Sequence, residues 1–455
     1  MNKRTSKYFL ICLILVLFTA SLAVLLNNGL FLDFTETNSS GPEVETSGLL
    51  WQKNIENFAT GLDVTNGKVY TIDLFGNICC FNALTGDSVW KGSIGGYWGS
   101  GVTASNSMVY GGKIATYVGA LDVKDGRFQW EVGTLTDTRW SKRAPSNITV
   151  LEDRLYVISD NFEVYNATTG VLLWETENNQ FNLNSTVNHP AWVIAWPFED
   201  GRLFGVGGGL NVGRFIYRLD PDTGTVLWNK PCSAPSEIPV VYDNQVIVRN
   251  HTGEKTTVLS LDETSGDLLW SYDVDAEVFQ PTAYNDLLFF GATDDSFYAL
   301  NLVDGTLVWN SQVDSQNITT LVNSDNPLEG LSILIDYENQ RIVSGFAVTT
   351  QRSVNGTQMG DEYWGIMCSL DMDTGNITWS NHFNGDGDIS NDVYVYAFAL
   401  TANNIYLTTV YDFRVFSKTT GNIIESQKFE HALSSPVTEN GKVFVAADLW
   451  LNAYD

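Results

Sequence analysis

The chain contains 455 residues, of which 44% are hydrophobic and 13% aromatic, so it can build a large apolar core and is not disordered throughout. Its formal net charge of −28 argues against nucleic acid as a partner, because no basic patch is present to neutralise phosphates. Only 17% of the residues are charged, so the acidity reflects a shortage of Lys and Arg rather than an acid-saturated surface.

The first predicted domain, residues 1–26, is a membrane anchor or a signal sequence. Positions 8–26 are uncharged and mostly apolar, and Lys3, Arg4 and Lys7 precede them. As a helix these positions would span about 28 Å, close to the roughly 30 Å hydrocarbon core of a bilayer. Basic residues remain on the cytoplasmic side, so the rest of the chain is expected outside. A signal sequence cleaved after a small-residue site is the competing interpretation.

Residues 27–47 form a polar, acidic linker between this segment and the repeats that follow. A retained anchor predicts a single-pass protein of the cell membrane, whereas a cleaved signal predicts a secreted protein. Both interpretations place residues 48–455 on the extracytoplasmic side.

Residues 48–455 are dominated by one repeated motif. Each complete copy has Asp or Asn four positions before a Gly and Trp four positions after it. The complete copies are FNALTGDSVW (81–90), ALDVKDGRFQW (120–130), YNATTGVLLW (165–174), RLDPDTGTVLW (218–228), SLDETSGDLLW (260–270), ALNLVDGTLVW (299–309) and SLDMDTGNITW (369–379). A further copy, 416–425, carries Glu425 where the others have Trp. Such fixed spacing identifies a repeat architecture.

The motif predicts two strands joined by a tight turn. Its Asp or Asn can bond nearby backbone N–H groups, and its Gly supplies the positive φ of the turn. A Trp at one fixed place in each repeat buries about 150–250 Å², enough to pack between neighbouring sheets. The predicted structural tryptophans are Trp51, Trp90, Trp130, Trp174, Trp228, Trp270, Trp309 and Trp379. Another strand pair precedes each copy, which gives four strands in about 40 residues, the pattern of a propeller blade.

This repeat resembles the pyrroloquinoline-quinone (PQQ)-type, quinoprotein dehydrogenase-like β-propeller family, whose recurring motif is A-x-D-x-x-T-G-x-x-x-W. The resemblance covers residues 48–455 and implies an all-β fold, a PQQ-like β-propeller of four-stranded blades. The family normally closes with eight blades, whereas the motif count here is nine. Its members include quinoprotein dehydrogenases, the propeller subunit of the bacterial outer-membrane assembly machinery and sensor domains, so the motif specifies fold rather than function.

The two ends of the repeat region predict how the ring closes. The chain reaches a motif Asp at Asp455 without the Gly and Trp that should follow, and Gly48 and Trp51 supply them at the other end. We therefore expect Leu49 to Ile55 to be the fourth strand of the last blade, which removes an open sheet edge.

Two segments interrupt the regular spacing of the motif. Residues 187–216 and 320–365 fall in the longest intervals between motif glycines. Long loops on a rigid scaffold are common binding sites, so these segments are predicted to be loop elaborations, with simple loop drift as the alternative.

The family resemblance implies a quinone enzyme as one alternative. Such enzymes need Ca²⁺ held by Glu and Asn, an Asp base, an Arg near the quinone, and often adjacent cysteines beside the cofactor. Cys79 and Cys80 are adjacent, but they lie in a predicted strand, where neighbouring side chains point to opposite faces. The remaining groups cannot be assigned residue by residue. No catalytic or cofactor-binding residue is therefore predicted, and the residues do not support a PQQ site or the calcium that accompanies it.

One acidic segment has the donor spacing of a calcium loop. Asn384, Asp386, Asp388 and Asp392 place oxygen donors on alternate residues of NGDGDISND. The segment lacks the sixth-position Gly and the twelfth-position Glu of such loops, so a solvated acidic turn is the competing interpretation.

The sequence therefore predicts an extracytoplasmic β-propeller that acts as a non-catalytic binding or assembly scaffold. Its expected partners are the membrane, through residues 8–26, and another envelope protein, a peptide or a glycan. A PQQ-dependent dehydrogenase-like enzyme and a structural surface-layer component are the alternative functions.

Overall fold

The structure is a computed structural model that describes residues 48–96, 99–113, 117–132, 147–158, 162–176, 192–198, 200–209, 213–232, 239–252, 255–313, 329–330, 333–354, 357–389, 395–409, 412–429 and 434–455. They belong to one compact unit, Ser47–Asp455. The second unit, Met1–Thr46, lies outside the described residues, as do the predicted anchor (1–26) and linker (27–47). In the described ranges, no helix has the length and apolarity required to cross a membrane.

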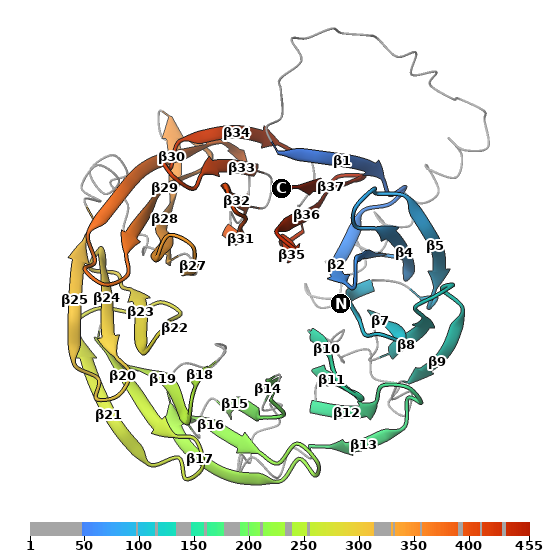
Figure 1. The fold of residues 1–455 in the computed structure, drawn as a ribbon, viewed down its shortest axis with the longest axis horizontal. Coiled ribbons are helices and arrows are strands. Elements are labelled where there is room, and N and C mark those ends of the chain that lie inside the picture. Colours follow the sequence, from blue (N-terminus) through green and yellow to red (C-terminus); the bar gives the residue numbers. More distant parts are fainter. Residues whose placement is uncertain are drawn as a thin grey trace, which may run out of the picture. The chain divides into compact units, whose positions relative to one another are not determined.

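The strands that the structure describes form nine antiparallel sheets, arranged as the blades of a propeller ring (Figure 1). In blades 1 to 8 the strands follow chain order from the centre of the ring to its rim. The motif count of nine is thus confirmed, and the family norm of eight does not apply to this chain.

The first four blades are regular four-stranded sheets. Blade 1 comprises β2 (Ala59–Thr65), β3 (Lys68–Asp73), β4 (Asn77–Asn82) and β5 (Ser88–Ser93). Blade 2 comprises β6 (Gly99–Ala104), β7 (Met108–Lys113), β8 (Tyr117–Asp122) and β9 (Phe128–Val132). Blade 3 comprises β10 (Asn147–Leu151), β11 (Arg154–Ile158), β12 (Phe162–Asn166) and β13 (Leu172–Glu175). Blade 4 comprises β14 (Trp192–Pro197), β15 (Leu203–Gly209), β16 (Gly213–Leu219) and β17 (Val226–Cys232).

The next four blades include one that is enlarged. Blade 5 comprises β18 (Val240–Tyr242), β19 (Gln245–Thr252), β20 (Lys255–Asp262) and β21 (Leu268–Val274). Blade 6 comprises β22 (Thr282–Tyr284), β23 (Leu287–Gly291), β24 (Ser296–Asn301) and β25 (Leu307–Gln312). Blade 7 comprises β26 (Glu329–Gly330), β27 (Leu334–Asp336), β28 (Arg341–Val354), β29 (Thr357–Asp371) and β30 (Ile377–Ile389). Blade 8 comprises β31 (Val395–Leu400), β32 (Asn404–Thr409), β33 (Asp412–Ser417) and β34 (Ile423–Lys428).

The ninth blade, called the closing blade below, combines both ends of the unit. It comprises β35 (Val437–Glu439), β36 (Lys442–Ala447), β37 (Trp450–Tyr454) and, as its outer strand, β1 (Leu49–Asn54). β1 is antiparallel to β37, with Leu49 opposite Tyr454 and Asn54 opposite Trp450. The predicted closure by the N-terminal strand is confirmed, and it gives the backbone groups of β37 a partner on each side.

In the described parts of both predicted loop elaborations most residues lie in strands, which corrects that expectation. The glycine-rich part of 187–216 forms β15 and β16, and Trp192 and Trp196 lie in β14. Within 320–365, most described residues belong to β28 and β29, which pair along their whole length. In both segments, glycine and polar residues obscured the alternating pattern by which a strand is predicted. The strands of a blade need not be uniformly apolar, because packing against neighbouring strands also stabilises them.

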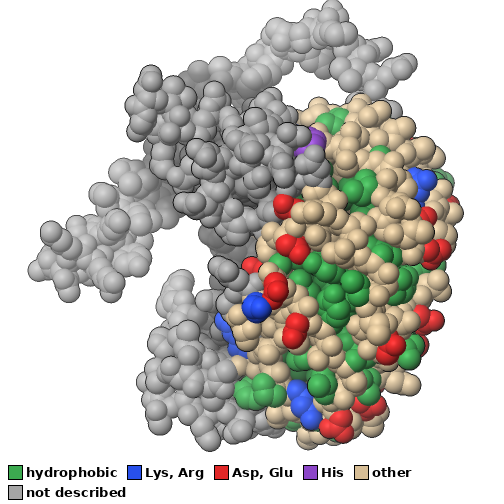
Figure 2. Space-filling model, turned by 90° about the vertical axis from the view of Figure 1, so that its left-hand side faces the viewer, with side chains coloured by type: hydrophobic (Ala, Val, Ile, Leu, Met, Phe, Trp, Pro, Cys, Tyr) green, Lys and Arg blue, Asp and Glu red, His purple; other side chains and the backbone are tan. Residues whose placement is uncertain are grey.

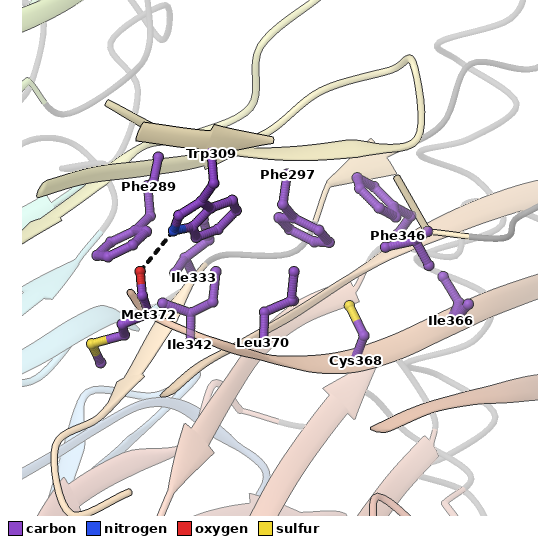
Figure 3. Close-up of a cluster of buried hydrophobic side chains, with 12 residues drawn as sticks. Phe289, Phe297, Trp309, Ile333, Ile342, Phe346, Ile366, Cys368, Leu370 and Met372 are labelled. Carbon is purple, nitrogen blue, oxygen red and sulfur yellow. Dashed lines mark hydrogen bonds between the residues drawn. The ribbon is translucent and has the colours of Figure 1, made fainter. Parts of the chain in front are cut away.

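The apolar core is divided among the interfaces between blades. Each of the nine interfaces in the described part of the ring has its own cluster of buried side chains. Between blades 6 and 7, Phe289 and Trp309 of one blade pack against Ile342, Leu370 and Met372 of the next (Figure 3). The ring is therefore stabilised mainly by contacts between neighbours, as in other repeat proteins.

Candidate functional site

The repeat tryptophans lie one at each of eight interfaces, and each contacts the blade that follows its own. Every indole Nε1–H donates to a backbone carbonyl of the next blade, over 2.7 to 3.2 Å. The acceptor is the residue after the motif Asp, Asn or Ser in seven cases, as for Trp309 and Met372 at 2.7 Å (Figure 3). Trp130 instead donates to Thr168, one residue further on. We call each of these contacts a Trp dock.

The motif glycines form the other side of each dock. A Cβ added to any of the eight would lie 2.3 to 2.8 Å from the indole of the preceding blade. These glycines also have φ values between 69° and 73°, which residues with a side chain rarely adopt. The motif therefore requires its single Gly for two reasons: the backbone conformation of the turn, and the space that the Trp of the preceding blade occupies.

The docks are structural features rather than a shared binding site. Six of the tryptophans are only 7 to 9% exposed, and Trp51 and Trp130 are half-buried. Because each lies at a different interface, the ring does not bring them together in one pocket. Their burial and hydrogen bonding account for their place in the repeat.

The four cysteines outside the predicted anchor are free thiols. Cys80 is fully buried between blades 1 and 2, whereas Cys79 packs between blade 1 and the closing blade. The two side chains thus point to opposite faces of β4, as predicted. This arrangement does not fit the adjacent-cysteine ring of a quinone pocket, and burial raises the pKa of both thiols.

The candidate calcium residues are only partly covered by the structure. The backbone of Asn384, Asp386 and Asp388 belongs to β30, where Asn384 is opposite Trp364 of β29. Their side chains, and Asp392 as a whole, lie outside the described residues. Among the residues described, no group of three acidic, His or Cys side chains is placed to hold a metal ion. The calcium site stays a prediction.

A repeated feature that the sequence analysis missed lies directly before the Trp position of each blade, including blade 8, where Glu425 replaces the Trp. In every blade the pairing of the two outer strands shifts by one residue at this point, as in a β-bulge. The extra residues are Leu50, Val89, Gln129, Leu173, Leu227, Leu269, Val308, Thr378 and Ile424. Seven of them are apolar, and these are 42 to 54% exposed. The recurring aliphatic residue before the Trp was the signal in the sequence.

Exposed aliphatic side chains recur on the outer strands of consecutive blades, and blades 3 and 8 carry Val171, Leu172, Leu173, Ile423 and Ile424. We call the part of this surface on blades 4 to 7 the apolar rim; it consists of Leu227, Leu268, Leu269, Leu307, Val308 and Ile377 on β17, β21, β25 and β30. Figure 2 shows the side of the unit that carries β21 and β25, where hydrophobic side chains gather and acidic side chains lie around them. Exposed apolar surface of this kind on a soluble domain commonly marks an interaction site.

Acidic residues of the motif turns border the apolar rim. Asp222, Asp267, Asp304 and Asp373 are exposed and lie a few residues before the rim side chains of their blades. The Thr306 hydroxyl donates to Asp304 over 2.7 Å, and this hydrogen bond lowers the pKa of that carboxyl. Lys230 is 3.4 Å from Asp267 and offsets its charge only in part, because both groups are solvated. The border of the rim is therefore negative at neutral pH.

Comparison with known proteins places this geometry among related propellers. The outer membrane protein assembly factor BamB of Yersinia pestis is 21% identical over 289 residues, covering 61% of this chain and 65% of that protein. The BamB of Shewanella oneidensis is 23% identical over 317 residues, covering 56% of this chain and 77% of that protein. The chain thus spans less than two thirds of the first of these relatives.

A solved structure with the same architecture is the quinohemoprotein alcohol dehydrogenase ADHIIG from Pseudomonas putida HK5. It superposes with a TM-score of 0.51, at 13% identity, over 90% of this chain and 76% of that one. At that identity the likeness concerns the fold alone. The family described as outer membrane protein assembly factor BamB matches residues 43–188, 163–273 and 213–447. With most of its length matched and its nine blades built on the family motif, the chain belongs to this family of PQQ-like β-propellers.

Proposed function

We propose that this chain is a non-catalytic binding and assembly scaffold of the cell envelope, and that the apolar rim is its binding surface. The relatives described as assembly factors support a role of this kind. The observation that carries the proposal is the repeated β-bulge, which exposes one residue per blade, apolar in seven of them, directly before the Trp position. An exposed side chain with no role in the core can contact a binding partner.

The rim also indicates the chemistry of the partner. Its aliphatic side chains offer apolar area without hydrogen-bonding groups, which favours a protein segment over a glycan. The bordering carboxylates favour a partner that carries Lys or Arg beside its own apolar residues. We therefore assign to the rim an aliphatic, basic segment of another envelope protein.

The mode of contact follows from the geometry of the outer strands. A bulge interrupts the regular row of backbone groups that an added strand would need. The partner is thus expected to bind through side chains rather than as an extra strand on β21 or β25. Residues 8–26, retained as an anchor, would keep the propeller next to such partners on the extracytoplasmic face of the membrane.

Site-specific photo-crosslinking in the native envelope tests this function. A photoreactive residue replaces Leu269 on the apolar rim, or Gln129 of blade 2, an exposed polar bulge residue outside the rim. We expect position 269 to capture a discrete protein segment that contains Lys or Arg and aliphatic residues. The double variant L268S/L307S, with the photoreactive residue at 269, should lose that product. Equal labelling at 129 and 269, or capture of lipid alone, would contradict the proposal.

A dye-linked dehydrogenase assay separates the scaffold from the enzyme alternative. The full chain is incubated with pyrroloquinoline quinone and Ca²⁺ and then with alcohols and sugars. We expect no dye reduction above that of free quinone. Turnover that depends on the protein would show that the chain is an enzyme, even though Cys79 and Cys80 point to opposite faces of β4.

A further inference from the structure

The interface between blade 8 and the closing blade lacks the Trp dock found at the other eight interfaces. Glu425 occupies the Trp position and is opposite Val415 across β33 and β34, as Trp379 is opposite Ser369 in blade 7. The Glu425 side chain is only 8% exposed. A carboxyl group therefore sits in the buried place that an indole fills elsewhere in the ring.

The turn that faces Glu425 is also built differently. It joins two segments distant in the sequence, because the Asp455 N–H donates to the Gly48 carbonyl over 3.0 Å. Blade 8 holds this turn through the Tyr406 hydroxyl and the Asn404 amide, which both donate to the main-chain oxygen of Asp455. Side-chain hydrogen bonds thus replace a Trp dock at the point where the ring closes.

In the described part of this interface, the surroundings of Glu425 are apolar and contain no cation that balances its charge. Tyr406, Phe413 and Tyr454 form an aromatic group with ring centroids 4.8 to 6.0 Å apart in this interface. Val443 and Val445 of β36 and Leu49 of β1 complete it. Asp455 is a charged neighbour of Tyr406 in this interface, and it is negative. Arg414 lies on the other face of β33, because its neighbours Phe413 and Val415 point into this interface.

The Glu425 carboxyl is not fully satisfied. Its Oε2 atom is buried and has no hydrogen-bond partner among the described residues. Burial raises the pKa of Glu425, and the charge of Glu425 adds to the effect of burial in raising the pKa of Tyr454. An ionised carboxylate left without a partner in an apolar interface is costly, and opening of that interface would hydrate it.

We propose that the ring opens at the interface between blade 8 and the closing blade, and that loss of the Glu425 proton weakens this interface. Protonation favours the closed ring, since the carboxyl holds its proton more tightly when closed than when hydrated. Closure is therefore strongest below the ordinary pKa of glutamate and weakens as the pH rises through the raised value. This inference does not depend on the function of the apolar rim.

Hydrogen exchange of the full chain between pH 5 and pH 8, corrected for intrinsic exchange rates, tests the inference. We expect the amides of β34 and β37 to exchange severalfold faster at pH 8 than at pH 5, relative to those of β25, where Trp309 forms a dock. E425Q keeps the size of the side chain and cannot ionise. It should remove this pH dependence and leave β34 and β37 as protected at pH 8 as at pH 5.

A second variant separates Glu425 from its acidic neighbour. D455N changes only the side chain and keeps the main-chain oxygen that Tyr406 and Asn404 contact, so it should retain most of the pH dependence. The inference is overturned if the exchange of β34 and β37 in the unaltered chain follows that of β25 at every pH. It is also overturned if the dependence survives E425Q or disappears only in D455N.

Discussion

The Trp dock between blades 5 and 6 predicts a strong, measurable coupling between two residues. Trp270 is 7% exposed, and its Nε1–H donates to the Leu302 carbonyl over 2.7 Å. Truncation of a buried Trp to Ala costs about 3–5 kcal/mol, through lost burial and the cavity left behind. The variant W270A should therefore lower the free energy of unfolding by about that amount.

Gly305 is the partner of Trp270, and its substitution should act through two separate costs. Its φ is 73°, so an alanine there pays about 1–2 kcal/mol for a left-handed backbone. The added Cβ would also lie 2.5 Å from the Trp270 ring, and this overlap adds to the first cost. In the double variant W270A/G305A the indole is absent, so G305A costs only the free energy of the left-handed backbone.

The double-mutant cycle should therefore be non-additive by about 0.5–3 kcal/mol, with the double variant more stable than the sum predicts. Gly441 provides the matched control, because its φ is also 73° and nothing lies within 4 Å of an added Cβ. G441A should cost only the backbone term and add to W270A. Guanidinium unfolding followed by far-ultraviolet circular dichroism measures all these free energies without relying on Trp fluorescence. Additive costs for W270A and G305A would refute the dock as the reason for the motif Gly.

Three further predictions concern the closure, the calcium segment and the topology. Removal of residues 1–47 should leave the free energy of unfolding unchanged. Removal of residues 1–55 also deletes β1 and exposes β37, so it should cause aggregation that light scattering detects. Equal behaviour of the two variants would show that β1 is dispensable. If the segment with Asp386 and Asp388 binds calcium, titration calorimetry should detect Ca²⁺ binding to the unaltered chain, and D386N/D388N should abolish it. The same heat of binding in both chains would show that this segment is an acidic strand without a calcium site. Protease added to intact cells should digest the propeller, and full protection would contradict an extracytoplasmic location.

The sequence was sufficient for the architecture because one local pattern encodes both the turn and the interface. Asp or Asn, Gly and Trp at fixed spacing place every motif turn and eight of the interfaces where the structure has them. The number of blades also followed from counting copies, once the Trp51 segment was joined to the blade that ends at Asp455. Local pattern and global fold agree, which is the mark of a well-specified structure.

Features that depend on residues of a neighbouring blade or strand were not predictable in the same way. Glu425 was visible as a departure from the motif, but its burial depends on Tyr454 and other residues of the closing blade. The half-buried state of Trp130 likewise depends on the neighbouring blade. The strand at Asn384 was mistaken for a loop, because acidic and glycine residues favour turns by local propensity while pairing with β29 decides the outcome.

The direction of the Trp docks has a consequence for how such rings change size. Every dock joins a Trp of one repeat to a carbonyl and a Gly of the next, and neither side depends on how many repeats separate it from the ends. Duplication or loss of one repeat therefore leaves every surviving dock intact, and only the turn per blade changes, from about 45° for eight blades to about 40° for nine. Gene duplication within such a family can thus yield a larger ring in one step, with no intermediate that has an unmatched interface.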